Sequence, residues 1–388
     1  MDFDLSPDQS ALADAVARLC ADFPDLYWLA CDRDHRFPEG FVAAIAKAGW
    51  LGIAMPTSVG GAGLGVTEAA IMMHAIARSG AGMAGVSSVH INLFGPMPLV
   101  VAGTAAQQSR FLPPLMRGED RVCFGVTEPD AGLDTTRITT RAERHGDHYV
   151  VTGQKIWTST AQSANRILLL TRTKPIAPDS KPADGLSLFY ADLDRSKVEV
   201  REIPKMGRHA VDSNMLFIDG LVVPQDRLIG REGDGFAMLL HGLNPERILV
   251  AAEAIGIGED ALARATAYAR ERRVFGRAIG QNQAIQHPLA RAHAELGAAK
   301  LMMFRAASLF DKGQPSGVEA NMAKYLAAEA AWRACETAVM THGGMGYAQE
   351  FHVERLLREV LITRIAPVSR EMILSHIAEK ALGLPKSY

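Results

Sequence analysis

Apolar residues recur at helical spacing through the first 120 residues of the chain. Ser6-Pro7 has the form of an N-cap followed by proline at the first helical position, and Leu12 and Val16 follow one turn apart. Residues 55–65 are rich in glycine and predict a long loop. Further helices are predicted at residues 41–50, 68–78 and 104–111, the last ending before Pro113-Pro114.

The pattern changes to short apolar runs with a period of two between about residues 121 and 232. His145-Gly146-Asp147 predicts a turn, and residues 174–183 predict a loop. Several short strands without an intervening helix favour a small antiparallel barrel or sandwich. The predicted strands are residues 149–155, 166–171, 186–192, 198–203, 214–218 and 221–223.

The helical period returns from about residue 233 in long alanine-rich stretches. Asn244-Pro245-Glu246 predicts a helix start, with a cap, a proline at the first position and an acid in the first turn. This helix is expected to run to about Arg270. The other predicted helices are residues 283–312, 318–343, 350–365 and 368–382. The chain therefore divides into a helical domain (1–120), a β domain (121–232) and a second helical domain (233–388).

Composition narrows the functional classes. The 388 residues carry a formal net charge of −2 at pH 7, which argues against general binding of nucleic acid or anionic membranes. Four scattered cysteines without a CxxC motif suit reduced thiols. The most apolar run, residues 94–103, is broken by Gly95, Pro96 and Pro98, and the acidic N-terminus differs from a signal peptide. We expect a soluble cytoplasmic protein.

Two phrases in the β region carry the strongest chemical signal: CFGVTEPDAGLD from Cys123 and GQKIWTST from Gly153. The first is an apolar strand running into a turn formed by Pro129, Asp130 and Gly132. The second places three hydroxyl residues behind Trp157. These residues alone favour an ordinary strand–turn–strand unit. A site for a flat heteroaromatic ring with polar edges is the alternative.

TEPDAGLD resembles the TEPxAGSD signature of the acyl-CoA dehydrogenase family, and KIWTST resembles the flavin-binding segment of that family. The resemblance runs nearly from end to end. It implies an α+β fold with an N-terminal helical domain, a middle antiparallel β-barrel and a C-terminal four-helix bundle. It also implies FAD as cofactor, an electron-transferring flavoprotein as electron acceptor, and a homotetramer. Leu133 departs from the family, which usually has serine there near the cofactor pyrophosphate.

Two later segments indicate a functional role only through this resemblance. RERRVFGRAIGQNQ, from Arg270, is by itself a basic helix end followed by Gly276. In the family a similar stretch contacts the FAD of the neighbouring subunit, through positions that correspond to Arg272, Phe275 and Gln283. THGGMGYAQEFHVERLLRE, from Thr341, would otherwise be a helix ending in a double glycine.

The family also indicates a position for the catalytic base. The usual glutamate after the ERxxRD motif is absent, because Ala366, Pro367 and Val368 occupy that segment. Isovaleryl- and long-chain-type members carry the base directly before an arginine on the first long C-terminal helix, where this chain has Glu246-Arg247. Taken alone, Glu246 is a first-turn glutamate stabilising a helix; the resemblance makes it the predicted base. Pro367 lacks the N–H that helps to polarise the thioester carbonyl in the family.

The remaining roles implied by the resemblance concern FAD and CoA. Thr127 and Ser159 are expected to hydrogen-bond the flavin ring, Trp157 to pack against it, and Asn244 and Arg247 to contact the pantetheine arm. The other expected cofactor-binding residues are Phe124, Val126, Gly132, Met340, Gly343, Gly344, Ser369 and Glu371.

Two other patterns are set aside. Residues 256–261 fit the dinucleotide motif GxGxxA, but they lie inside a helical stretch, so close helix packing is the better interpretation. No metal-ligand spacing appears, and His90, His287 and His342 are isolated.

The predicted activity is FAD-dependent α,β-dehydrogenation of an acyl-CoA thioester. The alternatives are an enzyme of the same fold with different chemistry, a reductase or a desulfinase-like member, and a non-catalytic CoA-ester-binding paralogue. Acyl-chain length and branching are not readable, because the sequence does not show which of Met73, Val86, Leu93 and Met97 point inward.

Overall fold

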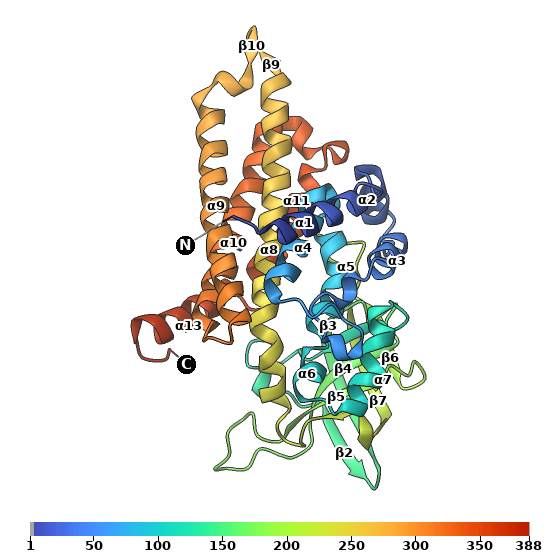
Figure 1. The fold of residues 1–388 in the computed structure, drawn as a ribbon. Coiled ribbons are helices and arrows are strands. Elements are labelled where there is room, and N and C mark those ends of the chain that lie inside the picture. The colour runs from blue at the N-terminus through green and yellow to red at the C-terminus, as the bar shows by residue number, and fades with distance from the viewer. Residues whose placement is uncertain (1–3, 388) are drawn as a thin grey trace.

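The computed structural model describes residues 4–387 and has the predicted order of helices, then strands, then helices. Long helices of the last third form an upright bundle, the sheet lies at its lower end, and helices of the first third pack along one side (Figure 1). Helices α5 (Gly82–Phe94) and α8 (Gly235–Glu271) both contact strands of the sheet. These two helices therefore join the three parts.

The first third is helical, as predicted. The hydroxyl of Ser6 accepts a hydrogen bond from the backbone N–H of Gln9 at 3.2 Å, and the Gln9 side chain accepts one from the N–H of Ser6 at 3.1 Å. This capping box confirms the predicted helix start. The other helices of this part are α1 (Pro7–Cys20), α2 (Asp25–Arg33), α3 (Glu39–Lys47), α4 (Val66–Ile76), α6 (Met97–Ala102) and α7 (Ala105–Met116).

Helix α7 continues through Pro113 and Pro114, so the prediction that it ends before them is wrong. Each proline removes one backbone donor, which would leave the carbonyls of Ser109 and Arg110 without a helical partner. Both of those residues are exposed, so water can hydrate the freed carbonyls. The two prolines are tolerated because the carbonyls that lose their hydrogen bonds lie on the solvent-exposed face of α7.

Residues 66–102 form a nearly continuous apolar helical stretch with a kink at 77–81, where Gly80 has φ +91°. By length and composition this stretch could cross a membrane. However, 78% of its most apolar window is buried inside the protein. It packs as a core element, against α8 among others.

The middle part is one mostly antiparallel sheet, with strand order β6-β7-β3-β2-β4-β5-β8. Strand β1 lies outside this strand order and pairs in parallel with β4. The strands are β1 (Val122–Gly125), β2 (Arg141–His145), β3 (His148–Ser159), β4 (Arg166–Arg172), β5 (Leu186–Asp192), β6 (Val198–Glu202), β7 (Ser213–Pro224) and β8 (Leu228–Ile229).

Two details of the sheet differ from the prediction. Residues 214–218 and 221–223 belong to the single strand β7, because Gly220, with φ +69°, forms a bulge rather than a turn. Strand β2 was not predicted. Only Ala142 among its five residues is buried, so it lacks the apolar alternation that marks a strand.

The C-terminal part contains α8, α9 (Gln283–Asp311), α10 (Gly317–His342), α11 (Val353–Val360), α12 (Ile362–Ile365) and α13 (Arg370–Leu382). The prediction that α8 begins at Asn244 is wrong, because the helix begins at Gly235 and Pro245 lies inside it. The stretch 350–365, predicted as one helix, is divided into short segments.

The dinucleotide-like motif at 256–261 lies in the middle of α8, as expected for a packing motif. A Cβ atom on Gly256 would lie 2.6 Å from Ala77 Cβ and 2.6 Å from the carbonyl oxygen of His74. A Cβ atom on Gly258 would lie 2.7 Å from a methyl carbon of Leu296. The glycines allow α8 to approach its neighbours closely, and the interpretation as helix packing is confirmed.

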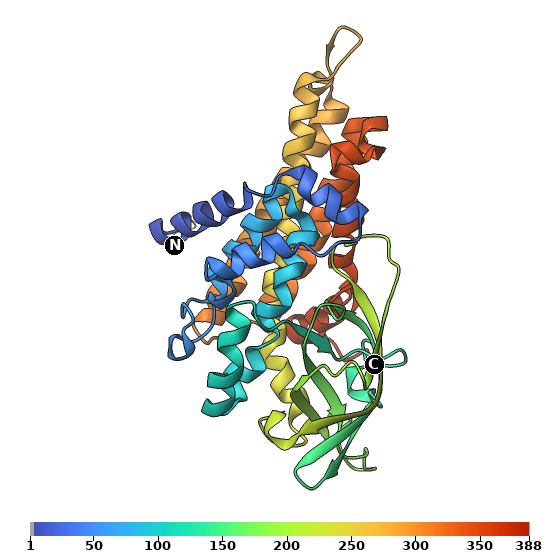
Figure 2. The ribbon, with the colours of Figure 1, turned by 90° about the vertical axis from the view of Figure 1, so that its right-hand side faces the viewer.

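Helices α8 and α9 are joined by a hairpin, β9 (Arg273–Val274) and β10 (Arg277–Ala278), that projects from the end of the bundle (Figures 1 and 2). Phe275 and Gly276 form its turn, with φ +51° and +80°. The Phe275 side chain is 99% exposed. An aromatic side chain held this far from its own core is typical of a contact with another molecule.

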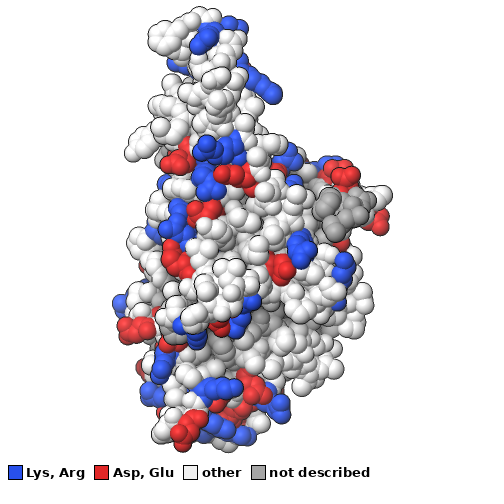
Figure 3. Space-filling view, turned by 90° about the vertical axis from the view of Figure 1, so that its left-hand side faces the viewer, with Lys and Arg blue, Asp and Glu red and all other residues white. Residues whose placement is uncertain are grey.

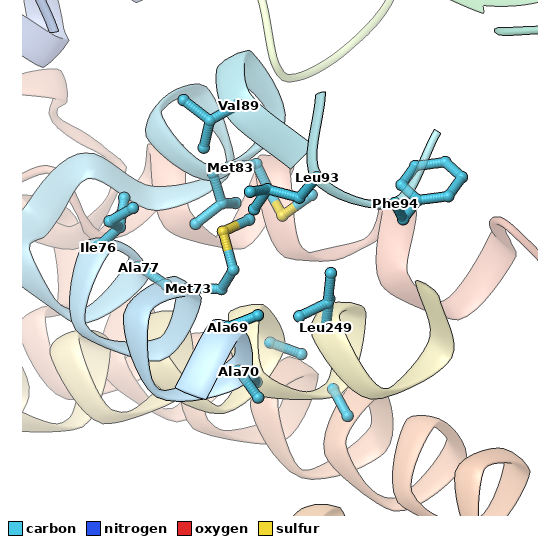
Figure 4. Close-up of a cluster of buried hydrophobic side chains, with 14 of the residues drawn as sticks. Ala69, Ala70, Met73, Ile76, Ala77, Met83, Val89, Leu93, Phe94 and Leu249 are labelled. Atoms are coloured by element: carbon cyan, nitrogen blue, oxygen red, sulfur yellow. The ribbon is translucent and has the colours of Figure 1, made fainter. Parts of the chain in front are cut away.

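The larger of the two hydrophobic cores among the described residues extends from α1 to α11, and part of it lies between α4, α5 and α8. Met73 of α4, Met83 and Leu93 of α5, and Leu249 of α8 point into the space between these helices (Figure 4). Among the candidates for lining the acyl chain, Met73, Val86 and Leu93 are buried, and Met97 is partly buried.

Surface charge agrees with the near-neutral composition. Lys, Arg, Asp and Glu are interspersed on the face shown in Figure 3, and no broad surface of one sign is visible there. Within residues 4–387, no group of three or more His, Cys, Asp or Glu side chains is arranged to hold a metal ion.

Candidate active site

The TEPDAGLD turn is fixed by a buried ion pair. The Lys155 ammonium, on β3, donates to Glu128 Oε1 at 2.9 Å and to the carbonyl of Val126 at 3.0 Å. The backbone N–H groups of Thr139 and Thr140 donate to the same carboxylate at 2.6 and 2.9 Å. Burial would raise the pKa of Glu128, but these partners outweigh it and the pKa falls to about 2.

The two phrases lie side by side, because the N–H of Ile156 donates to the carbonyl of Thr127 at 2.9 Å. The pairing of β3 with β7 is irregular between Lys155 and Thr158, and Trp157 at this irregularity has φ +59°. Its side chain remains 56% exposed beside Ser159. An open aromatic face next to hydroxyl and N–H groups fits a flat ring such as a flavin.

Arg208 lies directly behind Ser159, in the loop between β6 and β7. Its Nη2 donates to Ser159 Oγ at 2.8 Å. Arg208 has φ +59°, a strained conformation for a residue with a Cβ. Burial lowers the pKa of its guanidinium, which nevertheless remains a cation at neutral pH.

The predicted base, Glu246, lies in the first half of α8 and is 7% exposed. Within the described part of the chain, no hydrogen bond or ion pair engages its carboxylate. Burial raises its pKa to about 7, and the neighbouring Glu253 acts in the same direction. The charges of His90, Arg247 and Lys324 oppose this rise. An unpaired carboxyl with such a pKa suits proton transfer at neutral pH.

Helix α5 connects Glu246 to the two phrases. His90 Nδ1 lies 2.6 Å from Glu253 Oε1 on α8, and the His90 ring packs against Phe94 at 4.7 Å. Phe94 in turn contacts Phe124 of β1 at 5.5 Å. Burial lowers the pKa of His90, but Glu253 outweighs this effect and the net pKa is raised. The charges of Glu246 and Arg208 both act on His90, so His90 lies within electrostatic reach of both groups.

The loop that replaces the usual base approaches this region through Lys324 of α10. The buried Lys324 ammonium donates to the carbonyl of Val368 at 2.7 Å, next to Pro367. Burial lowers the pKa of Lys324 to about 8. Ser369 caps α13 by accepting a hydrogen bond from Met372 N at 3.3 Å.

Arg247 and Asn244, the predicted CoA contacts, interact with each other. Arg247 Nη1 donates to Asn244 Oδ1 at 3.1 Å and to the carbonyl of Leu243 at 3.2 Å. The Arg247 Nε atom is buried and has no partner among the described residues. Glu371, on the first turn of α13, is exposed and pairs with Arg370.

The structure separates the remaining candidates from this region. With a rise of about 1.5 Å per residue, Glu246 and Glu271 lie roughly 38 Å apart along α8. Arg272, Phe275 and Gln283 follow at the far end, in and beside the projecting hairpin. Within one subunit these residues therefore lie far from Glu246.

The glycine pair belongs to the far end as well. His342, at the end of α10, stacks on Tyr268 of α8 with ring centroids 4.3 Å apart. Gly343 and Gly344 follow immediately and are exposed, and Met340 is exposed in the last turn of α10. These positions lie near the hairpin and away from Glu246.

Several groups of the site were not found in the sequence. Arg208, the His90–Glu253 pair and Lys324 all surround Glu246 or Ser159. Lys324 had the clearest signal, because it is the single charge in the run NMAKYLAA of an alanine-rich helix. The signal for Arg208 was weak, because a strained φ value and an inward direction cannot be read from KMGRHAV.

Comparison with known proteins identifies the family of this chain. Family models for the acyl-CoA dehydrogenase N-terminal, middle and C-terminal domains match residues 6–119, 123–221 and 233–382. The chain belongs to the acyl-CoA dehydrogenase family. The predicted fold class and the predicted enzyme class are therefore confirmed, and this family uses FAD.

Relatives within the family differ in their named reactions. This acyl-CoA dehydrogenase family member is 38% identical over 390 residues to acyl-CoA dehydrogenase FadE12 of Mycobacterium tuberculosis, covering 99% of this chain and 98% of FadE12. It is 34% identical over 338 residues to subunit CarC of the caffeyl-CoA reductase–Etf complex of Acetobacterium woodii, covering 86% of this chain and 87% of CarC. The solved structure of PigA with FAD and proline is similar with a TM-score of 0.93, 26% identity, and coverage of 99% and 100%.

Proposed function

We propose that this protein is an FAD-dependent acyl-CoA dehydrogenase in which Glu246 removes the α-proton of the thioester. The supporting observation is the state of Glu246, which is buried, unpaired within the described residues, and has a pKa of about 7. A base with this pKa is half ionised at neutral pH. Uptake of a proton by the carboxylate is favourable because it removes a buried charge. The nearby side chains of His90 and Lys324 supply positive charge that supports the ionised form.

The flavin ring is proposed to lie on the surface formed by the two phrases, within the β domain of residues 121–232. Thr127 and Ser159 would hydrogen-bond its polar edge, and Trp157 would cover one face. When bound, FAD supplies the acceptor for the hydride that leaves the β-carbon. Phe124, Val126 and Gly132 would shape the rest of this surface, and the Glu128–Lys155 ion pair would hold it in place.

Binding of the CoA thioester is assigned to the start of α8 and the loop before α13. Arg247, with its unpartnered Nε, and Asn244 would contact the pantetheine arm. Pro367 has no N–H, so the N–H of Val368 is proposed to donate to the thioester carbonyl. Lys324 holds this loop in place through the Val368 carbonyl.

A second copy of the chain is proposed to complete the cofactor site. The hairpin residues Arg272, Phe275 and Gln283 are too far from Ser159 in their own subunit to share its flavin. Projection into a neighbour would explain the 99% exposure of Phe275. Met340, Gly343, Gly344, Ser369 and Glu371 would bind the rest of FAD, and the assembly would be a homotetramer. A monomeric holoenzyme in sedimentation would contradict this proposal.

Two finer points belong to the same proposal. We expect a cytoplasmic enzyme that passes electrons to an electron-transferring flavoprotein. A reductase remains the second candidate, because a carboxyl with a pKa of about 7 can also deliver a proton and because CarC belongs to a caffeyl-CoA reductase complex. Reaction of the reduced flavoprotein with enoyl-CoA and with oxidised electron-transferring flavoprotein would distinguish the two directions.

The central test is Glu246→Gln in the FAD-loaded enzyme. Anaerobic mixing with acyl-CoA thioesters should bleach the flavin of the wild type. The variant should keep its flavin but reduce it about 100- to 10,000-fold more slowly, the usual contribution of a general base. Glu143→Gln, on the exposed strand β2, is the matched control and should behave as the wild type. Unchanged flavin reduction in Glu246→Gln would refute the assignment.

A further inference from the structure

Arg208 is a cation without a counter-charge beside the proposed reaction centre. The only hydrogen bond of its guanidinium within the described residues is the one to Ser159 Oγ, at 2.8 Å, and no carboxylate of those residues forms an ion pair with it. Its Nε atom is buried and unpartnered. The residue as a whole is partly buried. Covering its guanidinium completely without an anion would be costly, because proteins normally pair such groups.

The acidic groups that act on Arg208 are already engaged elsewhere. Glu253, Glu359 and Asp212 are the acids close enough for their charge to affect it. Glu253 binds His90 at 2.6 Å, and Glu359 lies 3.2 Å from Arg355 and accepts the N–H of Met83 at 2.7 Å.

Asp212 is engaged as well. Its carboxylate accepts from Asn214 and, at 3.1 Å, from the backbone N–H of Gln162. Three acids therefore lie near Arg208, but each is engaged by another group and none forms an ion pair with it.

The loop that carries Arg208 is fixed by contacts on both sides. Arg358 Nη1 donates to the carbonyl of Met206 at 3.1 Å, and His209 Nδ1 lies 3.2 Å from Asp32 Oδ1. Gly207 packs so closely that a Cβ atom there would lie 2.8 Å from the carbonyl of Arg358. These contacts hold Arg208 at φ +59° and fix the course of the loop around it.

The position of Arg208 relative to Glu246 follows from α8 and α5. Glu246 and Glu253 are seven residues apart on α8, so they lie on one face of the helix at roughly 10 Å. The charge of Glu253 acts on Arg208, and the charges of Glu246 and Arg208 both act on His90, whose Nδ1 lies 2.6 Å from Glu253 Oε1. A thioester whose α-carbon lies at Glu246 would extend its acyl chain along this face toward Arg208.

We infer that the acyl group of the substrate ends in a carboxylate that binds Arg208, so that the enzyme acts on CoA monothioesters of dicarboxylic acids. A carboxylate would accept the free donors of the guanidinium and provide the missing negative charge. An uncharged acyl chain at this place would cover the partly buried cation without supplying an anion. This inference rests on the proposed function, because it takes Glu246 as the base and Ser159 as a flavin contact.

The test compares two substrate series on the holoenzyme: butanoyl-, pentanoyl- and hexanoyl-CoA against succinyl-, glutaryl- and adipyl-CoA. Flavin reduction under anaerobic conditions gives kcat/KM for each. At the best chain length, the wild type should prefer the carboxylated substrate by about 100-fold. Arg208→Met should reduce this preference about 100-fold, and Arg208→Lys should keep part of it because the charge remains.

Two further measurements separate recognition of the carboxylate from other roles of Arg208. Calorimetric binding of non-oxidisable thia analogues of both series should show the same loss of preference in Arg208→Met. Arg201→Met, on the exposed side of β6, is the matched control and should keep the wild-type preference. The flavin reduction potential of Arg208→Met is measured in parallel.

Each outcome decides between distinct explanations. Equal slowing of both series in Arg208→Met, with a shifted flavin potential, would overturn the inference and assign Arg208 to the flavin. A wild type that is reduced only by the uncharged series would overturn the inference and leave the proposed dehydrogenase intact. A wild type that neither series reduces would instead contradict the proposed function.

Discussion

The pKa of about 7 for Glu246 leads to a quantitative pH dependence. Proton abstraction requires the ionised carboxylate, so the rate of flavin reduction should follow the ionised fraction. That fraction is roughly 1% at pH 5 and about half at pH 7, a rise of about 50-fold. The ordinary carboxyl pKa of 4.5 would give about three quarters ionised at pH 5, and hence a rise below about 1.5-fold.

The assay is stopped-flow reduction of the flavin by saturating acyl-CoA between pH 5 and 9. Flavin content and substrate saturation are checked at each pH, so that the rate reports the chemical step. A plateau above pH 8 and a midpoint near 7 are expected. A change of less than about twofold between pH 5 and 7 would show that Glu246 is not a buried base.

A neighbouring charge provides an internal check. Lys324 lowers the pKa of Glu246 by stabilising its ionised form. Lys324→Met should therefore move the midpoint of the profile to higher pH, because that stabilisation is lost. A midpoint that stays in place, or moves to lower pH, would mean that the titrating group is not Glu246.

Two other predictions concern packing and the flavin turn. Gly256→Ala should destabilise the fold by about 1–3 kcal/mol, because the new Cβ meets Ala77 at 2.6 Å, whereas Gly297→Ala on α9, with no atom within 4 Å, should be neutral or stabilising by up to about 1 kcal/mol. Equal melting temperatures of these two variants would contradict the packing argument. Glu128→Gln should cost about 3–5 kcal/mol, because it leaves the Lys155 ammonium buried without its anion. Its melting temperature and FAD content should both fall, and an unchanged melting temperature would contradict the role of the ion pair.

Hydrophobic periodicity was enough to locate most elements. The predicted strand 186–192 coincides with β5, and the predicted helices 283–312 and 318–343 agree with α9 and α10 to within a residue or so. In these elements the buried positions repeat with a regular period, and such a period can be recognised from the sequence alone. The order of helices, sheet and helices followed from the same pattern.

The errors occurred where proline or glycine had two possible meanings. Pro113 and Pro245 predicted a helix end and a helix start, yet both lie inside helices. Gly220 predicted a break between two strands, yet it forms a bulge within one. In each case the chain on both sides is held by tertiary packing, which a local pattern cannot show.

The active site was predicted unevenly for a related reason. Glu246 could be named because a family position pointed to it. The state of its carboxyl depends on His90, Glu253 and Lys324, which come from three helices far apart in the sequence. Arg208 depends on a strained loop held by Asp32 and Arg358, and no spacing along the chain reveals such a contact.

Helix α8 also restricts how the base can move. Glu246, Glu253 and Asp260 follow one another at intervals of seven residues, and all three are buried. Glu253 is tied to His90 of α5, and Arg264, which pairs with Asp260 on α8 itself, binds Asp25 of α2 at 2.7 Å. A slide or a rotation of α8 would break both of these charged contacts with neighbouring helices at once. The two contacts therefore fix α8 in place, and with it the direction in which the unpaired Glu246 carboxyl points.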